Sequence, residues 1–213
     1  EYGNITQAEA FEQFLEEVEY ADELGFDAVW IPEHHFSIYG MLGDTLTLAA
    51  AVAQRTKRIK IGTAVVLLPF QHPIRVAEQA ALVDVLSNGR LLLGVGRAYQ
   101  PKEFAGFGMD PSESRERFAE SLEMLIGVFT QEKFSYEGKF WSCEDVTLSP
   151  TPVQKPYPKM YMAAVSPPSY KIAAELGLSI LRAPRFTRID LVEEQWAEYN
   201  KYMRAAGHDP SAL

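Results

Sequence analysis

Two adjacent histidines, His34 and His35, follow Glu33 just after a short apolar run, residues 26–31. Histidine has an ordinary pKa near ~6.5, so its ring can transfer protons or hydrogen-bond an anion at neutral pH. Adjacent residues on an extended segment point to opposite sides, so we expect one ring to face a site and the other to brace it. A metal site is the weaker interpretation, because ligands on one side of a strand need the spacing His-x-His. The triplet therefore favours acid–base chemistry over a purely structural role.

A pair of arginines supplies the second candidate. Arg97 follows the apolar run 91–95, and Arg115 lies early in a helix that is expected to begin near Pro111. A cation near a helix N-terminus is unfavourable unless an anion is close. The two guanidinium groups and the helix end therefore predict a phosphate clamp, with two surface ion pairs as the alternative. Ser166, which precedes two prolines, could likewise bind phosphate or simply form a turn.

Three other features have ordinary structural explanations. The run 62–65 (Gly-Thr-Ala-Val) could let a flat ring lie against the backbone, but strand packing explains its composition as well. Cys143 has no histidine near it in the sequence and is not expected to be a nucleophile. Aromatic residues of the segment 134–156 are expected to form a satellite core, with a substrate mouth as the alternative; they are Phe134, Tyr136, Phe140 and Trp141.

Each polar cluster lies just after a run that is typical of a β-strand. The expected strands are residues 26–31, 58–68, 90–96, 159–165 and 178–183. The expected helices, marked by capping residues or by apolar residues three and four apart, are 6–24, 44–54, 72–88, 110–129, 169–176 and 190–206. Such alternation predicts parallel strands joined by right-handed crossovers. Because the carboxyl ends of these strands share one face, we expect the polar clusters to form one site.

These elements predict an α/β fold with a single domain, residues 1–213, and an excursion of short strands at about 134–156. Five core strands do not close a barrel of eight, and the pattern starts on a helix. We therefore expect an incomplete (β/α)8 TIM barrel that lacks its first strand and its last one or two units. An open, doubly wound sheet of five strands is the alternative.

The composition limits the classes of function. The 213 residues are 47% hydrophobic, enough for a sizeable core, and carry a net charge of −9. That charge argues against a general binder of nucleic acid or of anionic membranes. A single cysteine allows no internal disulfide and favours a reducing compartment. No apolar run reaches the ~18–20 residues of a membrane span, and no signal peptide is visible, so we expect a cytoplasmic protein.

Taken together, the motifs resemble those of the bacterial luciferase-like flavin monooxygenases over nearly the whole chain. Each motif alone is weak, but their combination and order are specific. The matching residues are Gly25-Phe26-Asp27-x-Val29-Trp30, Glu33-His34-His35-Phe36, Gly62-Thr63-Ala64-Val65-Val66-Leu67-Leu68-Pro69 with His72-Pro73, Ser87-x-Gly89-Arg90, Gly94-x-x-Arg97-x-Tyr99, Ser114-Arg115 and Ala174-x-x-Gly177.

The resemblance implies a (β/α)8 barrel that takes FMN as reduced flavin from a separate flavin reductase and uses O2. It implies that His34 is the catalytic histidine, and we expect Glu33, which precedes it near the flavin, to be catalytic as well. It also implies a non-proline cis peptide bond, Ala64–Val65, beneath the isoalloxazine ring. The other implied cofactor ligands are Arg97, Arg115, Ser166 and Ser169 for the phosphate, with Tyr99 of the shared motif.

Two departures from the family pattern bear on the reaction. The light-emitting subunit of luciferase has a reactive cysteine where this chain has Gly96, and a glutamate where it has Val165. We therefore expect a dark monooxygenase that acts on an aldehyde, ketone, alkane or similar small apolar substrate.

The family's barrels commonly pair through helices of the first half, so we expect a homodimer that uses a helix such as 44–54. We expect no metal, no nucleic acid and no membrane as partners. An F420-dependent oxidoreductase of the same fold and a non-catalytic flavin-binding subunit of a hetero-oligomer are the alternatives. A metal-dependent barrel hydrolase is a more distant one.

Overall fold

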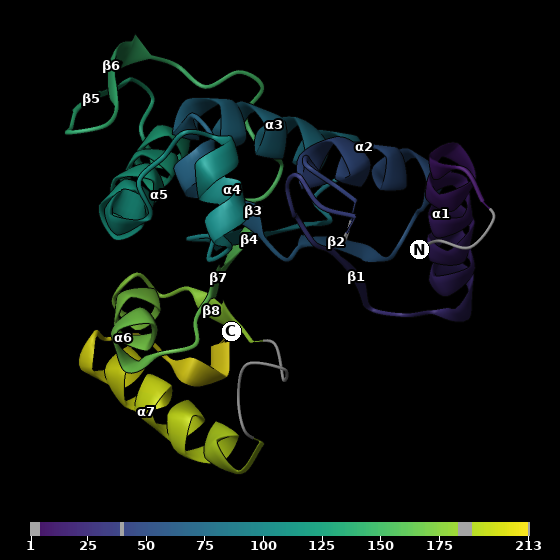
Figure 1. The fold of residues 1–213 in the computed structure, drawn as a ribbon. Coiled ribbons are helices and arrows are strands. Elements are labelled where there is room, and N and C mark those ends of the chain that lie inside the picture. Colours follow the sequence, from purple (N-terminus) through teal and green to yellow (C-terminus); the bar gives the residue numbers. More distant parts are fainter. Residues whose placement is uncertain (1–4, 39–40, 183–188, 213) are drawn as a thin grey trace.

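The computed structural model describes residues 5–38, 41–182 and 189–212, in which strands and helices alternate (Figure 1). The strands of the main sheet are β1 (Ala28–Ile31), β2 (Lys60–Thr63), β3 (Val66–Leu67), β4 (Leu91–Gly96), β7 (Lys159–Ala163) and β8 (Ser179–Leu181). The helices are α1 (Gln7–Leu24), α2 (Thr45–Arg55), α3 (Pro73–Leu86), α4 (Pro101–Gly106), α5 (Ser114–Thr130), α6 (Pro167–Glu175) and α7 (Val192–Ala205). Short 3-10 turns precede α3, α5 and α7, at Leu68–Phe70, Pro111–Glu113 and Ile189–Leu191.

The order of the strands in the sheet follows their order in the chain. Every pair in the order β1-β2-β4-β7-β8 is parallel, and β3 pairs with β4 beyond the end of β2. A doubly wound sheet reverses direction at a switch point, whereas a barrel adds each strand on the same side of the last. The described strands therefore form a curled, incomplete (β/α)8 barrel. This confirms the expected fold, and the doubly wound alternative is wrong.

Capping residues place the helices where the sequence predicts them. The backbone N–H of Thr6 donates to Glu9 Oε2 at 2.7 Å, and the Glu9 N–H donates back to Thr6 Oγ1 at 3.2 Å, which completes a capping box. Gly25 ends α1 with φ of +87°, a conformation that favours glycine. Asp44 caps α2 through the N–H of Thr47. These signals are local, so they can be read from the sequence.

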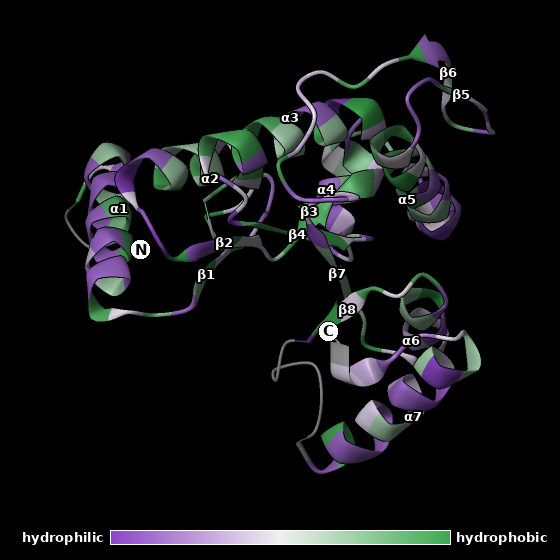
Figure 2. Cartoon of the chain, turned by 180° about the vertical axis from the view of Figure 1, so that it is seen from behind, coloured by the Kyte–Doolittle hydropathy of each residue, from purple (hydrophilic) through white to green (hydrophobic). Residues whose placement is uncertain are grey.

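The main core lies between the helices and the sheet. Figure 1 shows α1, α2 and α3 side by side along one face, with α6 and α7 packed together beyond β8. Hydrophilic residues predominate on α7, whereas α2 and α3 carry more hydrophobic ones (Figure 2). The largest fully buried side chains come from strands and helices alike and include Ile31, Ile61, Leu91, Leu93, Leu122, Met124, Tyr170 and Tyr199.

Three features differ from the expectation. The strand expected at 58–68 is two strands, β2 and β3, interrupted at Ala64 and Val65. Helix α4 was not expected at all. The excursion contains an antiparallel pair, β5 (Phe134–Glu137) and β6 (Ser142–Val146), but three of its four named aromatic residues, Phe134, Tyr136 and Trp141, join the main core. The Phe134 ring lies against Gly127 of α5, where an added β-carbon would come within 2.2 Å of it. The expected satellite core is therefore wrong.

In the described residues, no helix combines the length and the apolar character that crossing a lipid bilayer requires.

Candidate active site at the carboxyl edge of the sheet

Glu33 is a buried hub at the end of β1. Its side chain accepts hydrogen bonds from the Leu67 N–H at 3.2 Å, the Thr45 hydroxyl at 3.3 Å and the Gln71 side-chain amide at 3.2 Å. The Nε2 atom of His35 lies 3.2 Å from the same carboxylate. Glu33 therefore joins β1 to α2, β3 and the loop before α3. The sequence suggested a catalytic Glu33, and the structure gives this residue a bracing position beside the site.

His34 faces a different set of partners. Its Nδ1 atom lies 3.0 Å from Glu103 Oε1 and 2.7 Å from Gln100 Nε2, and its ring meets the Tyr99 ring edge-on. The backbone N–H of His34 donates to the Leu42 carbonyl at 2.9 Å. The ring is therefore oriented by Glu103 of α4 and by Tyr99 and Gln100 in the segment that joins β4 to α4.

His35 packs into an aromatic cluster on the opposite side from His34. Its ring meets Phe107 edge-on at 4.7 Å between centroids and Phe70 at 5.9 Å, and Phe36 lies beside it at 5.8 Å. Gly106 permits this packing, because a β-carbon there would come within 2.2 Å of the Phe36 ring. The two adjacent histidines thus have separate surroundings, as the alternation of an extended segment predicts.

The interruption between β2 and β3 is tied to the end of β1, three residues before His34. The Ala64–Val65 peptide bond is cis, as the family resemblance implies, and the Ala64 N–H donates to the Ile31 carbonyl at 2.7 Å. The Val65 side chain covers Gly96: a β-carbon at Gly96 would lie 2.3 Å from Val65 Cγ2. A cysteine at position 96 would therefore require Val65 to move, which accounts for glycine at this departure from the luciferase pattern.

Arg97 and Arg115 come close together just past β4. Arg97 donates to the hydroxyl of Ser114, the first residue of α5, at 2.8 Å. Partial burial lowers the pKa of Arg97, and the positive charge of Arg115 lowers it further. The two cations therefore repel each other in a chain whose net charge is −9. A bound anion would relieve that repulsion, which is what a phosphate clamp requires.

Ser166 and Ser169 lie at the N-terminus of α6. The Ser169 hydroxyl accepts from the Ser166 N–H at 3.0 Å and donates to the Ser166 carbonyl at 2.7 Å. Since β7 pairs with β4 in the register Met162↔Val95, Ser166 and Arg97 follow neighbouring strands at the same edge. The helix end adds N–H groups and a positive dipole end to that edge.

The predicted site residues therefore collect at one edge of the sheet, as parallel strands dictate. Sequence reasoning missed Glu103 and Gln100, the partners of His34. A signal was present, since Pro101 and an acid in the following turn are typical of a helix start. The described residues contain no group of three or more His, Cys, Asp and Glu side chains that could hold a metal ion.

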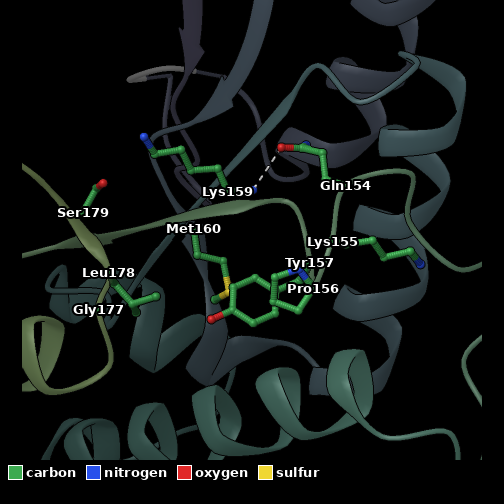
Figure 3. Close-up of a pocket in the computed structure, with 9 residues that line it drawn as sticks. All are labelled: Gln154, Lys155, Pro156, Tyr157, Lys159, Met160, Gly177, Leu178 and Ser179. Atoms are coloured by element: carbon green, nitrogen blue, oxygen red, sulfur yellow. Dashed lines mark hydrogen bonds between the residues drawn. The ribbon is translucent and has the colours of Figure 1, made fainter. Parts of the chain in front are cut away.

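A cavity of about 380 Å³ lies elsewhere, at the opposite end of the strands. Figure 3 shows its lining, which includes Lys159 and Ser179, the first residues of β7 and β8. The Lys159 N–H donates to Gln154 Oε1 there at 3.3 Å. Active sites of (β/α)8 barrels form at the carboxyl ends of the strands, so this cavity is separate from the candidate site.

The described residues form a sequential parallel half-barrel with a histidine–carboxylate pair and an arginine pair at its carboxyl edge, the edge at which (β/α)8 barrels form their active sites. The family can be stated as well. The chain belongs to the luciferase-like monooxygenase family, whose model matches residues 2–213.

Individual relatives support this assignment. The oxygenase component of the flavin-dependent trigonelline monooxygenase of Acinetobacter baylyi is 30% identical over 197 residues, which cover 92% of this chain and 54% of that protein. Monooxygenase RslO1 from Streptomyces bottropensis has a TM-score of 0.90 at 37% identity, over 94% of this chain and 61% of that one. The oxygenating constituent of 3,6-diketocamphane monooxygenase from Pseudomonas putida, solved with FMN, has a TM-score of 0.89 at 25% identity, over 98% of this chain and 61% of that one. This chain thus spans little more than half the length of these relatives.

Proposed function

We propose that this chain carries the flavin site of an FMN-dependent monooxygenase, which uses reduced FMN and O2 to oxygenate a small apolar organic substrate. The observation that carries the proposal is the hydrogen bond from Arg97 to the hydroxyl of Ser114 at 2.8 Å, which brings the Arg97 guanidinium to the residue next to Arg115 at the start of α5. A cationic pair at the carboxyl edge of an acidic barrel suits a phosphate, and FMN carries one.

The chemical types of the residues at this edge suit the two parts of FMN, its phosphate and its ring system. Arg97, Arg115, Ser166 and Ser169 would hold its phosphate. The small, exposed Ala64 and the neighbouring Val65, together with Tyr99, would lie against its ring system. When bound and reduced, FMN supplies the two electrons that activate O2.

His34 is the residue proposed to handle protons. A histidine ring ionises near neutral pH, so it can donate or accept a proton where oxygen chemistry takes place. Glu33 acts differently in this proposal: its buried carboxylate fixes the loops on either side of the histidines and keeps their backbone in place. The aromatic rings Phe36, Phe70 and Phe107 limit the access of water on the His35 side.

The proposal includes a separate flavin reductase as the source of reduced FMN, and a homodimer as the assembly. The identity of the apolar substrate, among aldehydes, ketones, alkanes and similar molecules, belongs to the proposal as well. The trigonelline relative supports the two-component arrangement, because its name describes an oxygenase component. F420 stays the alternative cofactor, and a titration of the protein with reduced F420 beside reduced FMN separates the two.

The test is rapid mixing of the protein and photoreduced FMN with oxygenated buffer, followed by absorbance. We expect the bound flavin to reoxidise more slowly than free FMN, through a phase that free FMN lacks. His34→Gln should remove that phase while FMN still binds. Arg75→Met, on the exposed side of α3, is the matched control and should behave as the unmodified protein. Reoxidation of the unmodified protein at the rate of free FMN would contradict the proposal.

A further inference from the structure

Glu103 is a buried acid with an incomplete set of partners. Its side chain is 1% exposed, and it lies in the first turn of α4. Its Oε1 atom lies 3.0 Å from Nδ1 of His34 and accepts the backbone N–H of His35 at 3.1 Å. Its other oxygen, Oε2, is buried and has no hydrogen-bond partner among the described residues. Burying half of a carboxylate without a partner is unfavourable, so packing alone does not account for an acid here.

Gln100 competes with Glu103 for the same nitrogen of His34. Nδ1 lies 2.7 Å from Gln100 Nε2 and 3.0 Å from Glu103 Oε1, and one ring nitrogen cannot accept from the amide and donate to the carboxylate at once. The carboxylate decides the outcome, because its Oε1 atom is buried and, among the described residues, has only the His35 N–H as another donor. Gln100 is only partly buried and can turn its amide so that Oε1 faces the ring. Nδ1 therefore carries the proton.

We propose that Glu103 is the positioning residue of His34, whose carboxylate keeps the proton on Nδ1 and thereby makes Nε2 the acceptor of the neutral ring. The inference deepens the proposed function, since it rests on His34 acting at the reacting flavin. Glu103 does not itself touch substrate or cofactor in this account. It acts through the ring, whose tautomer is set by the hydrogen bond that the other nitrogen makes.

Nitrogen NMR of histidine distinguishes the two tautomers directly. The full chain is labelled with 15N-histidine and measured at about pH 8.5, some two units above the ordinary histidine pKa of ~6.5. The chain has four histidines, so the His34 signals are assigned by their loss in His34→Gln. We expect the Nδ1–H form in the unmodified protein. Glu103→Leu should give mostly the Nε2–H form, and Glu103→Gln a mixture of both.

Two controls separate positioning from a structural role. Glu78→Gln changes an exposed acid that pairs with Arg75 on α3, and should leave the His34 tautomer unchanged. Circular dichroism and FMN affinity show that each Glu103 variant is folded, and Glu103→Gln serves if Glu103→Leu does not fold. In oxygenation, Glu103→Gln should lower kcat by roughly 10-fold or more at unchanged FMN affinity, because general acid–base catalysis contributes about 10²–10⁴-fold.

The tautomer readout does not depend on flavin chemistry. A His34 ring that is Nε2–H in the unmodified protein, or that stays Nδ1–H in the folded Glu103 variants, would overturn the inference. If Glu103 sets the tautomer but the protein shows no oxygen chemistry with FMN, the positioning role stands and the proposed function fails. The two ideas therefore fail in distinguishable ways.

Discussion

The hydroxyl of Thr63 satisfies both backbone polar groups of Gly94. It donates to the Gly94 carbonyl at 2.7 Å and accepts the Gly94 N–H at 2.9 Å. Among the described residues, Gly94 has no backbone partner on this side of β4. Strand β2 pairs with β4 only at Leu91 and Leu92, and β3 pairs with it only from Val95 onward. The Thr63 side chain thus replaces the missing backbone hydrogen bonds where the strand is interrupted between β2 and β3, at the proposed flavin site.

Thr63→Val tests that bridge. The substitution keeps the shape of the side chain but leaves two buried backbone groups of Gly94 without partners. We expect the free energy of unfolding to fall by about 2–6 kcal/mol, since each of the two groups costs about 1–3 kcal/mol. Urea unfolding measures the change, with the exposed Thr151→Val as the matched control. Equal stability of the two variants would show that the bridge contributes nothing.

Glu33→Gln tests the bracing role of that carboxylate. The amide presents an N–H₂ group to a site where Leu67, Thr45 and Gln71 all donate, so at least one hydrogen bond is replaced by a repulsive contact. We expect a loss of about 1–3 kcal/mol in the free energy of unfolding. The exposed Glu78→Gln should cost little in the same urea titration. A stable Glu33→Gln protein with abolished oxygen chemistry would instead return Glu33 to a catalytic role.

Arg97→Met should weaken the binding of FMN but not that of riboflavin, which lacks the phosphate. A hydrogen bond to a charged group contributes about 1.5–3 kcal/mol, so the FMN dissociation constant should rise roughly 10- to 100-fold. Fluorescence titration of both flavins measures the difference. An equal loss of affinity for FMN and riboflavin would show that Arg97 supports the fold and not the phosphate.

Acid should weaken the attachment of α1 to the segment before β2. Burial by itself raises the pKa of Asp22, but the N–H groups of Lys57, Ile59 and Arg58 all donate to its carboxylate, and the net pKa lies below the ordinary aspartate value. A lowered folded-state pKa means that this stabilisation is fully present above the unfolded pKa of about 3.9 and is lost as the pH falls through the folded value.

Asp22→Asn should therefore cost about 1–3 kcal/mol in the free energy of unfolding at neutral pH. The difference from the unmodified protein should shrink as the pH is lowered below about 4, where the unfolded chain's aspartates become protonated. Urea unfolding across this pH range measures both quantities. A difference that is independent of pH would mean that the charge of Asp22 is not what the three N–H groups stabilise.

Much of the fold could be predicted from local patterns in the sequence. Thr6 and Gly25 mark the ends of α1 through contacts within a few residues, and such contacts recur wherever the local pattern does. The break between β2 and β3 left no such mark, because apolar and β-branched residues run through Val65 to Leu68 and favour one long strand. The break depends on Gly94, which lies 31 positions from its partner Thr63.

The candidate site, too, could be predicted only in part from the sequence. Its location followed from the order of strands and polar clusters, since parallel strands place their ends together. The partner of His34 did not, because Glu103 lies 69 positions away and belongs to a six-residue helix, too short for apolar periodicity to reveal. The bracing role of Glu33 likewise depends on Leu67 and Gln71, which only the folded chain brings to it.

The central claim is that the carboxyl edge of this half-barrel takes reduced FMN. Anaerobic titration of the protein with reduced FMN and, separately, with reduced F420 tests it most directly. The account predicts saturable binding of reduced FMN that weakens in Arg97→Met, and markedly weaker binding of F420. Tight binding of F420 with no binding of FMN would contradict it and make the protein an F420-dependent oxidoreductase of the same fold.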